Sequence, residues 1–197
     1  MRHEREPTYI FVILTFILIL INTVLAYASA TLVPTNAAGI AYVFPAVAVM
    51  ILFGLWFGGY GAFAAYVGTL VGSGVLVHEN LAQNPQIAVL WAVSGLLQVL
   101  IPLVAVRSFE VDISLENLDS KRDLSIIILF GVIINNLIGA AWAAWSLGIL
   151  TPENIGSVFS AWLIGNVIVC LIIVPLGLKI FTPGVQRSRL YVKNYWY

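Results

Sequence analysis

Long apolar stretches with few charged side chains recur along the whole chain, separated by short breaks. A helix needs roughly 20 apolar residues to cross about 30 Å of hydrocarbon, because each residue adds about 1.5 Å and every backbone group must be bonded inside the helix. We therefore predict an all-α, polytopic integral membrane protein, folded as a six-transmembrane-helix bundle in a single domain over residues 1–197. The predicted spans are 9–30, 38–57, 60–78, 86–106, 124–148 and 156–178.

Composition supports this class and excludes several others. Apolar residues make up 61% of the chain and charged residues only 9%, whereas soluble domains carry about 25% charged residues. The formal net charge is zero, and no basic face is left for nucleic acid. Cys170 is the only cysteine, and His3 and His78 are far apart, so we expect no disulfide, metal site or cofactor.

The basic residues predict the orientation in the cell membrane, because lysine and arginine are retained on the cytoplasmic side. In a six-helix arrangement all of them fall on one face, which places both termini, a loop over 107–123 and a tail over 179–197 in the cytoplasm. The uncharged turn at Gly58 leaves open whether residues 38–78 cross fully or form a re-entrant hairpin. The basic residues are Arg2, Arg5, Arg107, Lys121, Arg122, Lys179, Arg187, Arg189 and Lys193.

Small residues and prolines are expected to shape the helix contacts. Gly68 and Gly72 form a GxxxG step that lets helices approach closely. A face with Ala26, Ala28 and Ala30 is a candidate dock for a partner subunit. Pro45 and Pro175 are expected to kink the second and sixth spans. No acidic or basic residue lies in the middle of a predicted span, which argues against an autonomous pump.

Tryptophans and amides recur at helical spacing in the last three spans. Each tryptophan lies one or two helical turns from an amide on the same face of its helix. In the predicted orientation the tryptophan is nearer the outer surface and the amide is nearer the centre of the bilayer. This pattern predicts that the three helices form an outward-facing pocket for a small, uncharged or zwitterionic, partly aromatic ligand. The alternative is a tryptophan belt facing lipid and amides that join helices. The candidate ligand-binding residues are Trp91, Gln98, Asn135, Asn136, Trp142, Trp162 and Asn166.

A catalytic constellation is not evident in the sequence. A serine nucleophile needs a nearby histidine and carboxylate, but His78 and Glu79 are adjacent at one outer helix end without an obvious third member. We therefore predict a protein that is not an enzyme. His78 and Glu79 are expected to cap the third span or to line the mouth of the pocket.

Three segments of the chain show a familiar pattern of small, aromatic and apolar residues. They are NAAGIAYVFPAVAVMILFGLWFGGYGAFAAYVGTLVGSGVL (36–76), LENLDSKRDL before the fifth span and AWLIGNVIVCLIIVP (161–175). Through these segments most of the chain resembles the membrane-associated sensor domains of bacteria and archaea (MASE type). This resemblance implies a sensory, signal-input role and a separate signalling partner. Asn166 stands where the family usually has an aspartate. The matching residues are Phe44, Pro45, Gly54, Arg122, Asp123, Trp162, Gly165, Asn166 and Pro175.

The size and six-span plan are also similar, more distantly, to the substrate-capture subunits of energy-coupling factor transporters. That similarity implies capture of a vitamin or nutrient and an ATP-driven transport partner. A purely structural membrane protein is the third alternative, and it predicts that Trp91, Trp142 and Trp162 face lipid. The sequence leaves the ligand, the oligomeric state and the choice between sensor and transporter open.

Overall fold

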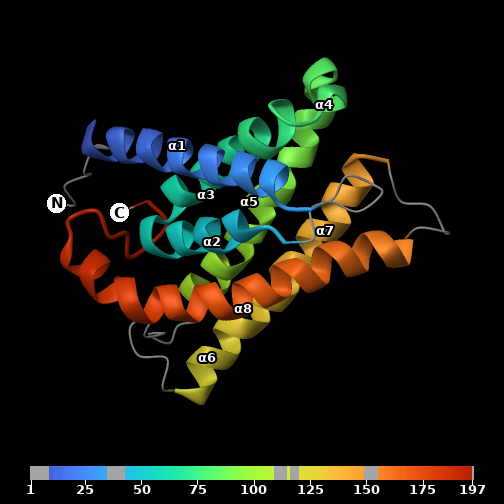
Figure 1. Ribbon diagram of the computed structural model, residues 1–197. Helices are drawn as coiled ribbons and strands as arrows, with labels where there is room; N and C mark the ends of the chain where they lie inside the picture. The colour runs from blue at the N-terminus through green and yellow to red at the C-terminus, as the bar shows by residue number, and fades with distance from the viewer. Residues whose placement is uncertain (1–8, 35–42, 109–114, 116–119, 149–154, 197) are drawn as a thin grey trace.

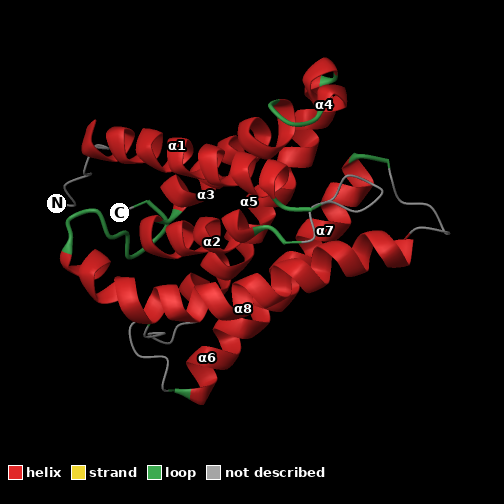
Figure 2. Ribbon diagram, viewed as in Figure 1, coloured by secondary structure: helices red, strands yellow, loops and turns green. Residues whose placement is uncertain are grey.

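The structure is a computed structural model that describes residues 9–34, 43–108, 115, 120–148 and 155–196. All regular structure in these ranges is helical, as predicted (Figure 2). Two segments, η1 and η2, are π-helical and continue directly from α-helices. The elements are α1 (Tyr9–Leu32), α2 (Pro45–Phe57), α3 (Gly59–Gly68), η1 (Thr69–Val75), α4 (Glu79–Gln83), α5 (Pro85–Ser108), α6 (Lys121–Ile128), η2 (Leu129–Ile134), α7 (Asn135–Ser146) and α8 (Ile155–Arg187).

Four helices in the described part of the chain are long and apolar enough to cross a membrane, which supports a membrane protein. They are Tyr9–Leu32, Pro85–Ser108, Lys121–Ser146 and Trp162–Arg187. The predicted count of six is not confirmed by this criterion. The 13 residues of α2 extend over only about 20 Å, and α3 is followed by the π-helical η1.

Several predicted boundaries differ from the structure. The expected kink at Pro45 is wrong, because Pro45 is the first residue of α2, where its missing N–H and fixed φ suit a helix start. Residues 38–42 of the predicted second span lie outside the described residues, as does most of the predicted loop. The third predicted span ends at Val75. The sixth continues past 178 to Arg187, although Pro175 and Pro183 lie inside it.

The first helices form a compact unit in which α1 packs on α3 and η1, while α2 packs on α3 and α8 (Figure 1). α1 and α3 run in the same direction, since Phe11 stacks on Tyr60 at 4.9 Å near their starts. Further along, a Cβ atom at Gly68 would lie 2.5 Å from the Cβ of Asn22. The glycine step therefore allows the close approach that the sequence predicts.

Of the alanine face predicted as a dock, Ala26 is buried, whereas Ala28 and Ala30 are partly exposed. Ala26 has no exposed surface, and its Cβ would lie 3.0 Å from a Cβ placed at Gly72. The side chain is thus used in packing α1 against η1. A partner subunit has no access to Ala26 in this arrangement, so the prediction is wrong for that residue.

The chain after α8 folds back over the turn between α2 and α3. Val192 donates its backbone N–H to the Trp56 carbonyl (3.0 Å), and Gly59 donates to the Tyr195 carbonyl (2.6 Å). Arg107 Nη2 donates to the carbonyl oxygens of Leu55 (2.9 Å) and Val192 (2.8 Å). These bonds join α2, α3, α5 and the tail at one end of the molecule.

Gly58 is expected to be intolerant of a side chain. Its φ is +59°, and an added Cβ would collide with the Tyr195 carbonyl and lie 2.8 Å from Val192 Cγ1. We expect Gly58→Ala to reduce the free energy of unfolding by at least about 2 kcal/mol, measured by thermal unfolding in detergent. Gly148→Ala is the matched control, because Gly148 has φ +63° and a Cβ there would meet nothing within 4 Å among the described residues. Equal losses in the two variants would show that the tail contact contributes nothing.

Candidate functional site

Three of the predicted amides meet in a buried cluster between α5 and α7. Gln98 Nε2 donates to Asn136 Oδ1 at 3.1 Å. Asn135 Nδ2 donates to the backbone carbonyl of Gln98, also at 3.1 Å. All three side chains are buried, so these bonds form where the neighbouring groups are apolar and an unpaired amide would be costly.

The bond from Asn135 has a specific backbone cause. In an α-helix the Gln98 carbonyl would accept the N–H of the residue four positions later, but that residue is Pro102, which has no N–H. Asn135 supplies the missing donor from the neighbouring helix. The four-residue spacing of Gln98 and Pro102 is visible in the sequence. It indicates that the Gln98 carbonyl needs a donor from outside its own helix.

Asn136 extends the cluster toward α8. Its Nδ2 donates to the Val132 carbonyl (2.7 Å) and also contacts Asn135 Oδ1 (3.4 Å) and Cys170 Sγ (3.6 Å). Gly139 leaves the room for Gln98, because a Cβ there would lie 2.5 Å from Gln98 Cγ. The π-helical η2 ends directly before Asn135, and single π-helical turns are frequent at functional sites.

Two of the predicted tryptophans converge nearer the α4 end. Trp91 is buried and packs with Leu81, Ala88 and Ala143, and the half-buried Trp162 packs against the same cluster. The His78 ring lies edge-on to Trp91 at 6.4 Å between ring centroids. Trp91 therefore does not face lipid, contrary to what a purely structural belt predicts.

Trp142 lies beside this cluster and is bonded differently. Its Nε1 donates to the Leu90 carbonyl at 2.7 Å, and its ring is 5.2 Å from that of Trp145. Trp145 is 60% exposed. Trp142 thus connects α7 to α5, whereas Trp145, which lies on the same helix, points outward.

Two buried hydrogen-bond donors in this region are left over. Trp91 Nε1 and Asn166 Nδ2 have no hydrogen-bond partner within the described parts of the chain. Leaving a buried donor unpaired costs about 1–3 kcal/mol, so each atom calls for an explanation. The side-chain amide of Asn22, which lies in the contact between α1 and α3, also has no hydrogen-bond partner among the described residues.

The described residues contain no group of three or more metal-ligating side chains. Comparisons with protein-family models, curated proteins and solved structures found no match for this chain. The site consists of a hydrogen-bonded amide cluster, two tryptophans that pack on one apolar cluster nearer α4, and two buried donors without a partner in the described residues.

The bond between Gln98 and Asn136 is expected to stabilise the bundle measurably. Polar contacts between membrane helices contribute roughly 0.6–2 kcal/mol. We expect a double-mutant cycle with Gln98→Leu and Asn136→Leu, measured by unfolding in detergent, to give a coupling energy in that range. Additive losses in the double variant would contradict a direct contribution of the bond.

His78 gives a pH dependence that can be tested. Burial lowers the pKa of His78 from its usual 6.5, so the unfolded chain binds its proton more tightly than the folded protein does. Stability is therefore expected to fall as the pH drops below about 6.5. His78→Phe keeps a ring beside Trp91 but cannot titrate, so its unfolding temperature should lose less between pH 7 and pH 5. The same pH slope in both proteins would refute the assignment.

Proposed function

We propose that the protein binds a small organic ligand between α5, α7 and α8, and that binding serves as the input of a sensory domain. The observation that carries the proposal is the pair of buried, unpartnered donors, Trp91 Nε1 and Asn166 Nδ2. The other amides of the site are bonded within the protein. A ligand that accepts hydrogen bonds would remove the cost of leaving these two donors unpaired.

The residues around the donors restrict the ligand's chemistry. Both free groups are N–H donors, so the ligand must present hydrogen-bond acceptors, such as the oxygens of a carbonyl or carboxylate or the nitrogen of an aromatic ring. Trp91 and Trp162 offer aromatic surface, which favours a ligand with a planar ring. The hydrogen bonds of the amide cluster are made by uncharged groups, and burial lowers the pKa of the His78 ring beside Trp91, which favours its neutral form, so an uncharged or zwitterionic ligand fits best.

Binding at this site is coupled to helix packing. The two donor atoms have essentially no accessible surface, so a ligand reaches them only if neighbouring helices separate. A ligand that binds the separated arrangement better shifts the equilibrium toward it. Such a repacking supports a sensory role, in which the change in helix packing is the signal passed to a partner protein.

The proposal includes six crossings of the cell membrane with both ends in the cytoplasm. It is supported by the turn after α2, which reaches the same end of the bundle as the start of α1, where Phe11 meets Tyr60. Arg107 and the tail meet at this end as well. The basic side chain of Arg107 and the basic tail therefore lie at the same end, which supports the proposed cytoplasmic side.

The test is ligand binding by the purified protein in lipid nanodiscs. A panel of uncharged and zwitterionic aromatic metabolites is screened for a raised unfolding temperature. For a compound that binds, Asn166→Leu and Trp91→Phe are each expected to weaken affinity about fivefold to 150-fold, the value of one buried hydrogen bond. Trp145→Phe, an exposed tryptophan, is the matched control and should bind normally.

Two results would contradict the proposal. Unchanged affinity in Asn166→Leu and Trp91→Phe would mean that the donors do not contact the ligand. Uptake of the labelled compound into vesicles containing the protein would favour a transport role over a sensory one. Bound compound without uptake is the expected result.

A further inference from the structure

A second surface with a distinct chemistry lies at the opposite end of α8. Four basic side chains, Lys179, Arg187, Arg189 and Lys193, are exposed there. The sequence from 155 to 197 contains no aspartate or glutamate. This end of the protein therefore carries positive charge that its own helix and tail do not neutralise.

The tail that bears Arg189 and Lys193 is held in a defined position. Val192 is buried and is bonded on both sides, through its N–H to Trp56 and through its carbonyl to Arg107. The Arg107 guanidinium also lies 5.8 Å from the centre of the Tyr191 ring. Lys193 follows directly, so its charge is presented from a fixed backbone position.

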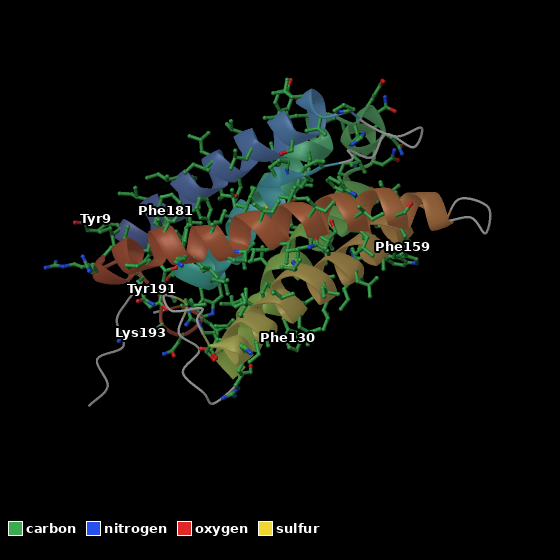
Figure 3. All side chains as sticks on the ribbon, turned by 60° about the horizontal axis from the view of Figure 1, so that its bottom comes forward. Tyr9, Phe130, Phe159, Phe181, Tyr191 and Lys193 are labelled. Atoms are coloured by element: carbon green, nitrogen blue, oxygen red, sulfur yellow. The ribbon has the colours of Figure 1, made fainter. Side chains whose placement is uncertain are left out.

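Exposed aromatic side chains flank these charges. Phe181 is 58% exposed and Trp196 is 53% exposed. The Trp196 ring packs edge-on against Tyr60 at 5.5 Å, which fixes its place beside the turn after α2. Tyr9, Phe181, Tyr191 and Lys193 lie toward one end of the molecule and Phe159 toward the other (Figure 3). Aromatic rings beside basic groups are typical of the headgroup level of a bilayer.

We propose that the surface formed by Arg187, Arg189, Lys193 and Trp196 binds the anionic phospholipid headgroups of the adjoining leaflet. Phosphate is the natural partner of arginine and lysine. A juxtamembrane cation near an anionic membrane surface strengthens binding about fivefold. Zwitterionic headgroups carry no net charge, so we expect them to bind this surface more weakly.

The test uses the full chain in bilayers that contain brominated lipids, which quench tryptophan fluorescence on contact. The contribution of Trp196 is isolated by comparison with Trp196→Phe. We expect brominated phosphatidylglycerol to quench Trp196 more strongly than brominated phosphatidylcholine. Arg189→Gln with Lys193→Gln should reduce that preference by about fivefold for each charge removed.

A matched control removes two basic residues elsewhere. Lys121→Gln with Arg122→Gln changes exposed residues in the first turn of α6 and should keep the preference. Equal quenching by the two lipids would overturn the proposal. Loss of the preference on adding inorganic phosphate would also overturn it, because the surface would then take a free anion. A circular-dichroism spectrum of each variant confirms that its helices are intact.

Discussion

Backbone polar groups inside an apolar bundle must find partners within the protein, because hydrocarbon offers none. At two places the regular helical bonding is interrupted and is then completed by groups from elsewhere in the chain. Pro102 removes the donor for the Gln98 carbonyl, and the turn at Gly58 ends α2 and starts α3. Each interruption is repaired by a group from elsewhere: Asn135 at the first, and Arg107 with the tail at the second.

These repairs explain how separate helices become one structure. The Asn135 bond joins α7 to α5, and Asn136 carries the connection on to Cys170 of α8. Arg107 joins the other end of α5 to α2 and the tail. Elsewhere the helices approach through glycine, as at Gly68 in the contact with α1. α5 is the element common to both polar contacts.

The sequence predicts some features well and others poorly, for physical reasons. Hydropathy locates α1 and α5 closely, because a long apolar stretch has few alternatives to a helix. It does not reveal that α2 begins at Pro45, or that η1 and η2 are π-helical, because an inserted residue in a helix leaves no trace in average hydropathy. Nor does it show that the tail bonds to the turn at Gly58, since backbone groups rather than side-chain types make those contacts.

The candidate site shows the same division. Gln98, Asn135 and Asn136, which the sequence assigns to one pocket, lie in one region, and Trp91 and Trp162 pack on one cluster. Their role in ligand binding stays a prediction. Spacing does not predict which amide atoms are bonded and which remain free. That depends on the exact approach of neighbouring helices, and it separates Trp91, with a free N–H, from Trp142, whose N–H is bonded to Leu90.

Trp91, whose N–H has no partner within the described residues, lies on the same helix as the interruption at Pro102. Trp91 lies near the start of the helix, Gln98 and Pro102 lie in its middle, and Arg107 lies at its end. In the proposed function, a ligand that separates α5 from its neighbours at Trp91 would act on a helix whose regular bonding is interrupted at Pro102. The Gln98 carbonyl depends on Asn135 for its partner, so a shift of α7 against α5 exposes an unpaired group and carries a cost of about 1–3 kcal/mol. Two distinct packings, rather than a graded deformation, are the expected consequence.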